Sequence, residues 1–288
     1  MAHEKTESEE SGLKYFILGT FGSGFLLFGT AMVFGATTST NLGTIAEVIK
    51  TGAYNPTLMV VGAVLILVSL GFKVAAVPFQ FWTPDVYQGA PTPVSAFMSV
   101  GVKAAGFAAL LRVFSLIFVE LSGTLTPVFW VIAALTMIIG NVVAVAQTNL
   151  KRMLAYSSIA QAGYLLMAFV PFGDAAARQN SIAAALFYLL AYGLASLGAW
   201  AVLIGLEGEK YSGATLDDLA GLGKKSPLTA VLMTVFMLSF AGIPLTLGFW
   251  GKFYLFRTAI EGGFIGLAVI GLLTSLVSAF YYLRVVVK

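Results

Sequence analysis

Apolar residues run along most of this 288-residue chain in long stretches that short polar segments separate. A helix needs about 20 predominantly apolar residues to cross a bilayer, and about eight stretches approach that length. The helices predicted in this way cover about 14–35, 57–82, 94–118, 127–147, 154–172, 181–206, 227–253 and 263–284. The pattern predicts an all-α, polytopic membrane bundle.

Composition supports this prediction, because hydrophobic residues make up 59% of the chain and charged residues only 10%. Soluble domains carry about 25% charged residues. The chain has no cysteine, and its single histidine, His3, lies in the polar start, so thiolate metal sites, iron–sulfur clusters and histidine clusters are excluded. The net charge of +3 follows from loop lysines and arginines that orient membrane proteins, and it requires no nucleic-acid partner.

Two of the predicted helices contain a proline close to a lysine. Lys73 precedes Pro78 in the helix over 57–82, and the GIP segment at 242–244 precedes Lys252 in the helix over 227–253. Proline breaks the helix around it, and lysine inside an apolar span is costly and usually marks an ion pathway. We therefore expect non-helical backbone within about four residues of each proline, with the lysines facing the bundle interior.

Another lysine, Lys103, lies well inside the helix over 94–118. All thirteen acidic residues fall in the polar start, loops or helix ends, so no carboxylate in the chain is an obvious partner for these lysines. A structural role remains open for Lys73, whose ammonium could bind carbonyls freed by the break. Lys252 could instead extend toward the membrane surface.

The two interrupted helices also indicate an internal repeat. Broken helices at corresponding places in two halves are typical of inverted-repeat transporters. On this interpretation 1–13 is a polar leader, 14–118 holds the last three helices of a first repeat, and 119–288 holds a complete five-helix second repeat. The polar segment WTPDVYQGAPTP is expected to be a loop, with Pro84 and Asp85 as loop-forming residues.

Basic residues predict the orientation of the chain. With eight helices both termini share a side, which holds nine lysines and arginines against four on the other: Lys5, Lys14, Lys151, Arg152, Lys210, Lys224, Lys225, Arg284 and Lys288 against Lys50, Arg112, Arg178 and Arg257. Cytoplasmic loops carry the excess of basic residues, so we expect both termini in the cytoplasm.

Three segments resemble one known family: FKVAAVPFQFWTPDVYQGAPTPVSAF, NLKRMLAYSSIAQAGYLLMAF and AGIPLTLGFWGKFYLF. They are similar to the antiporter-like membrane subunits of NADH-quinone oxidoreductase (respiratory complex I), in particular the subunit N or subunit 2 branch, from about residue 10 to the end of the chain. The resemblance implies about fourteen helices in two inverted five-helix repeats. The chain would match the sixth to thirteenth of these helices, so it is expected to be truncated at its N-terminus.

The resemblance also implies a set of site residues. The proton-path lysines of the family fall on Lys73, Lys103 and Lys252, and Lys14 matches a recurring lysine at the start of the first helix. Gln80 stands where the family commonly has a histidine, and the buried glutamate that pairs with the lysine matching Lys73 lies on an upstream helix. Further hydroxyls and amides that could carry protons between the lysines are Ser157, Ser158, Gln161, Tyr164, Tyr188 and Tyr192.

The function that the resemblance implies is proton translocation coupled to quinone reduction, by a subunit that itself holds no cofactor. Quinone and NADH would act at other subunits, and its partners would be the lipid bilayer and the other membrane subunits of the complex, in a bacterial plasma membrane or another energy-transducing membrane. A subunit of a multisubunit sodium/proton antiporter or of a membrane hydrogenase is one alternative. A structural fragment that does not pump is the other.

Overall fold

The computed structural model describes residues 6–207 and 215–288, and within these ranges the regular structure is helical, with no β-strand. The longer helices are α1 (Thr6–Thr37), α3 (Pro56–Val74), α7 (Ser122–Val145), α8 (Leu150–Leu166), α9 (Ala175–Leu206) and α13 (Ile265–Val287). The shorter ones are α2 (Leu42–Thr51), α4 (Trp82–Gly89), α5 (Thr92–Phe97), α6 (Lys103–Leu110), α10 (Leu222–Lys225), α11 (Pro227–Ala241) and α12 (Leu247–Glu261).

Local signals in the sequence set where several helices begin. The side chains of Asn55, Asn149 and Asp174 accept hydrogen bonds from the first free backbone N–H groups of α3, α8 and α9. Such N-caps stabilise a helix by about 1 kcal/mol. Pro56 and Pro227 occupy the first position of α3 and α11, where the missing N–H costs nothing.

Six helical segments of the described residues are long and apolar enough to cross a membrane: Ser8–Thr37, Pro56–Val74, Thr92–Ser115, Val119–Val145, Ala175–Leu206 and Ile265–Val287. The remaining two predicted spans correspond to α8 and to the pair α11 and α12, which are shorter individually. The all-α membrane fold expected from the sequence is therefore confirmed.

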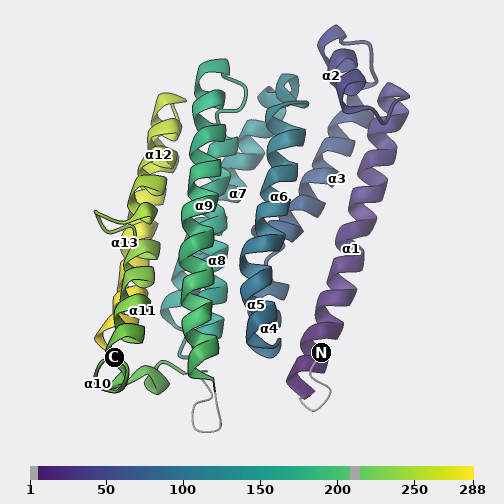
Figure 1. Ribbon diagram of the computed structural model, residues 1–288. Helices are drawn as coiled ribbons and strands as arrows, with labels where there is room; N and C mark the ends of the chain where they lie inside the picture. The colour runs from purple at the N-terminus through teal and green to yellow at the C-terminus, as the bar shows by residue number, and fades with distance from the viewer. Residues whose placement is uncertain (1–5, 208–214) are drawn as a thin grey trace.

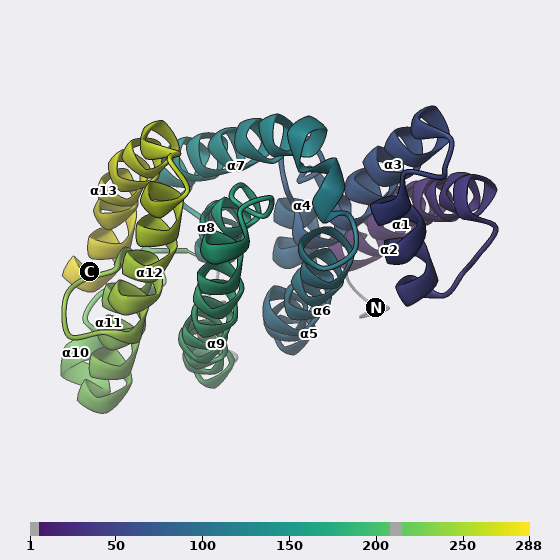
Figure 2. The ribbon, with the colours of Figure 1, turned by 90° about the horizontal axis from the view of Figure 1, so that it is seen from above.

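The helices stand side by side in an elongated row, with α1 and α3 at one end and α11, α12 and α13 at the other (Figures 1 and 2). The start of α1 and the end of α13 lie at the same end of the helices, and α2 lies at the opposite end. Helix α1 packs against α3 and α4, while α9 packs against α11 and α12. Each broken helix thus has one long helix beside both of its halves.

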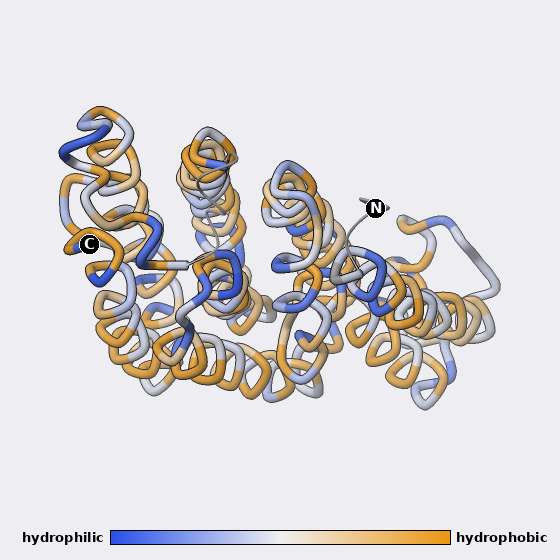
Figure 3. The backbone as a smooth tube through the Cα atoms, turned by 90° about the horizontal axis from the view of Figure 1, so that it is seen from below, coloured by the Kyte–Doolittle hydropathy of each residue, from blue (hydrophilic) through white to orange (hydrophobic). Residues whose placement is uncertain are grey.

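Helix α8 lies in the middle of the row and is buried along nearly its whole length. Its approach to α7 is so close that a Cβ at Gly163 would stand 2.6 Å from the backbone nitrogen of Met137. By contrast, α1 exposes Phe16, Phe21 and Leu27. Seen from below, the tube is orange along most of the helices, and blue segments gather in the loops and helix ends (Figure 3), as expected where lipid surrounds the helices.

Two expectations about polar segments are wrong. Helix α1 begins at Thr6 rather than near residue 14, so residues 6–13 of the expected leader are helical, while residues 1–5 lie outside the described residues. The segment WTPDVYQG is the helix α4 rather than a loop. Pro84 lies in its first turn, where no intrahelical donor is needed, so a proline there does not prevent helix formation. The division of the chain into two repeats stays a prediction.

Candidate proton-transfer site

The first break separates α3 from α4. Ala75 ends α3 in the left-handed region with φ 62°, and the Val77–Pro78 peptide bond is cis. The indole N–H of Trp82 donates to the carbonyl of Phe72 at 2.9 Å, and the N–H of Val77 donates to Thr136 Oγ1 at 2.9 Å. The Phe72 carbonyl also accepts from the N–H of Ala75 at 3.2 Å, so the indole is a second donor there, while Thr136 binds an N–H group that lies beyond the end of the helix.

Lys73 lies in the last turn of α3, next to this break, and its side chain is half-buried. Its Nζ lies 6.0 Å from the centre of the Phe72 ring. Within residues 6–207 and 215–288, no carbonyl, hydroxyl or carboxylate lies within hydrogen-bonding distance of that ammonium. The break expected beside Lys73 is present, but its ammonium does not bind the freed carbonyls.

The second break separates α11 from α12. Gly242 follows α11 with φ 79°, in the left-handed region that glycine adopts without strain. Lys252 is only 3% exposed, and its Nζ donates to the carbonyl of Ala241 at 3.2 Å and to Ser275 Oγ at 2.8 Å. The ammonium also stands 4.7 Å from the centre of the Tyr164 ring, in the range of a cation–π contact.

Lys103 is buried between the two breaks. It begins α6, which two π-helical segments flank, Met98–Val102 and Leu111–Ser115. Such π-segments are frequent at functional sites. Lys103 is 1% exposed, and its Nζ donates to the carbonyl of Ser158 at 2.5 Å. Among the described residues no carboxylate lies within 4 Å of Lys73, Lys103 or Lys252, as the sequence suggested.

Neutral polar side chains fill the space around Lys103 and Lys252. Tyr192 donates to Ser158 Oγ at 3.1 Å, and Gln161 Nε2 donates to Tyr282 OH at 2.9 Å. Tyr188 donates to Gln161 Oε1. These groups come from α8, α9 and α13, and each can both donate and accept hydrogen bonds.

A second cluster of such groups surrounds Tyr164, whose ring contacts Lys252. Asn141 Nδ2 donates to Tyr164 OH at 3.2 Å, and Tyr281 OH donates to Asn141 Oδ1 at 2.9 Å. Asn141, Ser275, Tyr281 and Tyr282 were not among the residues expected from the sequence. The signal that identifies them is the presence of polar side chains inside strongly apolar runs, including the adjacent pair of tyrosines.

The two weaker candidates lie on α1 and beside α4. Lys14 forms ion pairs with Glu10 at 2.7 Å and with Asp85 at 2.9 Å, and Asp85 also pairs with Arg152 at 2.8 Å. A pocket of about 210 Å³ adjoins this cluster. The side chains of this cluster are partly exposed, and solvent screens such ion pairs, so they are weak evidence for stabilisation. Gln80 is buried, and its Oε1 has no partner in the described residues.

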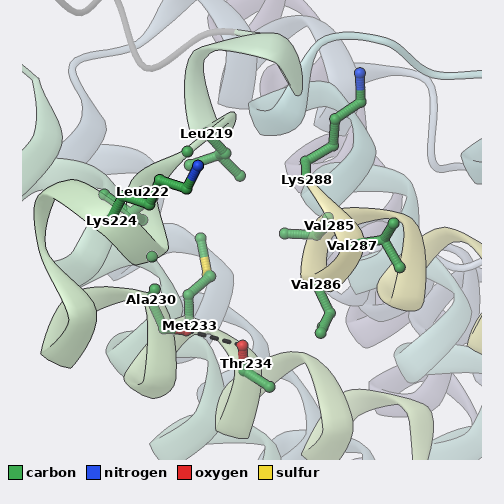
Figure 4. A pocket seen from close by; sticks show the side chains of 12 residues that line it. Leu219, Leu222, Lys224, Ala230, Met233, Thr234, Val285, Val286, Val287 and Lys288 are labelled. Atoms are coloured by element: carbon green, nitrogen blue, oxygen red, sulfur yellow. Dashed lines mark hydrogen bonds between the residues drawn. The ribbon is translucent and has the colours of Figure 1, made fainter.

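A separate pocket of about 250 Å³ lies between α10, α11 and the end of α13 (Figure 4). Met233, Thr234 and Val285 line it, with Lys224 and Lys288 at its edge. None of the expected site residues lines this pocket, and it is not part of the site.

Comparison with known proteins gives the family. Residues 1–278 match the family model described as "NADH:quinone oxidoreductase/Mrp antiporter, TM". The chain belongs to this family. It is therefore an integral membrane protein, and the resemblance drawn from the three sequence segments is confirmed.

The relatives of this antiporter-family chain include subunits N of NADH-quinone oxidoreductase. It is 51% identical over 286 residues to subunit N 1 of Herpetosiphon aurantiacus and 49% identical over 280 residues to subunit N 1 of Solibacter usitatus. These matches cover 98% and 97% of this chain, and 57% of each relative. The chain thus spans just over half the length of the curated relatives it matches.

Chains of three solved membrane complexes also match this chain in fold and sequence. A chain of respiratory complex I from Thermus thermophilus with bound Aureothin matches with a TM-score of 0.84 at 42% identity, over 99% of this chain and 60% of that one. The archaeal membrane-bound sulfane sulfur reductase matches with a TM-score of 0.89 at 31% identity, over 99% and 57%. The Mrp complex from Dietzia sp. DQ12-45-1b matches with a TM-score of 0.87 at 27% identity, over 97% and 50%.

Proposed function

We propose that this chain is the proton-translocating part of a subunit N of NADH-quinone oxidoreductase, which couples quinone reduction to proton transfer through buried lysines. The observation that supports it is the arrangement of Lys103 and Lys252, both buried in apolar helices, with neutral hydroxyl and amide groups between their helices. Identity to subunits N over nearly the whole chain supports the choice of complex.

On this proposal the lysines exchange protons one after another. A buried ammonium without a carboxylate partner is costly, so a small change in nearby charge shifts the balance between its charged and neutral forms. Tyr192, Gln161 and Tyr282 offer groups that can pass a proton along. Lys73 would serve as a third exchanging group beside the first break, with Lys14 and Gln80 in supporting roles.

The same proposal implies which partners the chain has and which membrane it lies in. The other membrane subunits of the complex would pack against the row of helices, while quinone and NADH would act at other subunits and this chain would bind no cofactor. The membrane would be a bacterial plasma membrane or another energy-transducing membrane. Both termini would face the cytoplasm, in line with the excess of lysine and arginine at that end.

The test uses the assembled complex in sealed vesicles. Lys103→Ala is expected to slow quinone-linked proton transfer by about 100-fold, the lower range for loss of an acid–base group. Assembly, judged by the redox subunits that copurify, should be retained. Wild-type proton transfer in this variant would show that Lys103 is a structural residue and that the chain only packs between partners.

An ion-exchanging subunit of a sodium/proton antiporter is the second candidate, because the Mrp complex shares the fold at 27% identity. Two measurements distinguish these functions: which subunits copurify with the chain, and which ion its proton movement requires. A complex I subunit copurifies with redox subunits and transfers protons in sodium-free buffer. An antiporter subunit copurifies without them, and its proton movement needs a sodium gradient.

A further inference from the structure

An apolar groove lies between α2, the end of α6 and the first turns of α9, at the end of the helices opposite to the start of α1. Its volume is about 480 Å³, within the range of about 300–1,000 Å³ that is typical of ligand pockets. Nine of the ten residues that line it are leucine, isoleucine, alanine or glycine, and the tenth is Arg112. The lining therefore suits an apolar ligand that carries one anionic group.

Three helical segments contribute to the groove, each with residues four positions apart. Such residues share one face of a helix, and the pairs are Leu42 and Ala46, Ala108 and Arg112, and Ile182 and Leu186. Leu186 is 53% exposed, so the groove is open to the lipid that surrounds the helices. This leucine also lies roughly 16 Å along α9 from its start, at 1.5 Å per residue. The groove therefore extends from the end of the helices into the apolar part of the membrane.

Arg112 differs from the two other arginines at this end of the helices. Arg257 Nε donates to the carboxylate of Glu261 at 2.7 Å, and Arg178 donates to the carbonyl of Phe172 at 3.3 Å. The side chain of Arg112 is exposed. It forms no hydrogen bond or ion pair with any residue of 6–207 or 215–288. Its guanidinium is therefore available to an anionic group from outside the chain.

The depth of Arg112 in the membrane indicates which anion it meets. The residue lies close to the end of the apolar span Thr92–Ser115, and long basic side chains near the end of a span extend to the lipid headgroups. A guanidinium binds phosphate through two parallel hydrogen bonds. A phospholipid carries such a phosphate next to its acyl chains, which matches the charge and the apolar lining of the groove.

We propose that this groove is a binding site for one phospholipid molecule. The phosphate accepts hydrogen bonds from the guanidinium of Arg112, and an acyl chain lies in the groove against Ala108 and Leu186. Every leaflet supplies phosphate at this depth, whereas a transmembrane helix of a partner would need an acidic residue at the same level. The lipid site does not rest on the proposed function, because its residues are separate from the buried lysines.

The test uses the assembled complex and a phosphatidylglycerol that carries a photoreactive diazirine in one acyl chain. After illumination, peptide mass spectrometry locates the labelled residues. We expect label on α9 around Leu186, at lipid concentrations below saturation. In Arg112→Gln we expect about tenfold less label at this position, the affinity equivalent of one charge-assisted hydrogen bond.

Two further variants and a second probe serve as controls. Arg257→Gln removes an arginine at the same end of the helices but leaves the groove intact, so the label around Leu186 should not change. Ala108→Phe keeps Arg112 and fills the groove, so the label should fall. A diacylglycerol with the same diazirine lacks the phosphate, and it should label the wild type and Arg112→Gln equally weakly.

Three results would overturn the proposal. Equal labelling of the wild type and Arg112→Gln by phosphatidylglycerol would show that the guanidinium does not bind the phosphate. Equal labelling of the wild type by the two probes would show that acyl chains enter the groove only as bulk lipid. Loss of a membrane subunit from the purified Arg112→Gln complex would assign the groove to that subunit. Proton transfer is not measured in this test, so its outcome is independent of the result with Lys103→Ala.

Discussion

The two broken helices share one design but treat their lysines differently. In each, a residue in the left-handed region ends the first half, Ala75 in one and Gly242 in the other. At the second break, Lys252 comes after the interruption and its ammonium binds the carbonyl of Ala241, the last residue of α11. At the first break, Lys73 comes before the interruption, and Trp82 rather than the lysine donates to the carbonyl of Phe72, which also accepts from the N–H of Ala75.

This difference distinguishes a structural role of the lysine from a role in the proposed proton transfer. Lys252 donates to the Ala241 carbonyl at the end of α11, so this lysine would have a structural role even without proton transfer. Lys73 has no such role, because Trp82 and the N–H of Ala75 donate to the Phe72 carbonyl instead. The alternative in which Lys73 satisfies carbonyls of the broken helix therefore lacks support in the hydrogen bonds. On the proposed function, this side chain adds an exchangeable charge.

The largest effect is expected from Lys252→Ala. It removes the ammonium that the proposed function assigns to proton exchange, and it leaves the Ala241 carbonyl with only the long hydrogen bond from Ser275 Oγ, at 3.4 Å. We expect proton transfer in the assembled complex to fall by about 100-fold, and the free energy of unfolding to fall by about 1–3 kcal/mol. Vesicle proton uptake and thermal melting measure the two losses.

Ser275→Ala is the control for that variant, because it removes a neutral partner of the ammonium and keeps the lysine. Its effect on proton transfer should be much smaller than that of Lys252→Ala. Equal losses in the two variants would mean that the hydroxyl, rather than the charge, governs transfer at the second break.

Lys73→Ala is expected to affect transfer alone. The half-buried ammonium has no hydrogen-bond partner in the described residues, so its loss should change the free energy of unfolding by less than about 0.5 kcal/mol. Proton transfer should fall on the order of tenfold, because water that reaches the position replaces the lysine in part. Lys50→Ala, at an exposed lysine of α2, is the control. A loss of stability as large as that of Lys252→Ala would erase the distinction between the two breaks.

Trp82→Phe tests the structural half of the comparison. The substitution keeps an aromatic ring but removes the N–H that binds the Phe72 carbonyl, at a position only 1% exposed. We expect the free energy of unfolding to fall by about 1–3 kcal/mol, measured as a lower melting temperature of the complex. An unchanged melting temperature would show that the N–H of Ala75 alone satisfies the Phe72 carbonyl.

The sequence was sufficient to predict both breaks, because proline and the GIP segment act locally on the backbone. It also predicted the burial of Lys103 and Lys252, because each lies inside a long apolar run. It did not predict that α4 is helical, since Pro84 and Asp85 are common in loops. A first-turn position makes both residues compatible with a helix, and that position depends on where the break releases the chain.

The partners of the lysines were the least predictable part. Lys252 meets Ser275 of α13 and the ring of Tyr164 of α8, contacts between helices that only the packing brings together. The different treatment of Lys73 also depends on Trp82, which lies nine residues further along and reaches the Phe72 carbonyl only because the chain turns back at the break. Residue spacing alone does not reveal such contacts.

The residues that end the first half of each broken helix are expected to give smaller losses of stability than Lys252→Ala or Trp82→Phe. Gly242→Ala places a side chain in the left-handed region, with the new Cβ 3.0 Å from Lys252 Cδ. We expect a loss of about 1–2 kcal/mol in the free energy of unfolding. In Ala75→Gly, relief of a similar strain is opposed by greater freedom of the unfolded chain and by a lost buried methyl group, so the net change should lie within about 1 kcal/mol of zero. Thermal melting of both variants measures these changes in stability.

The two variants should also differ in proton transfer. Of the two residues, only Gly242 lies against the side chain of Lys252, so Gly242→Ala should slow proton transfer while Ala75→Gly should not. Equal transfer rates in the two variants would show that the backbone at the second break does not position Lys252.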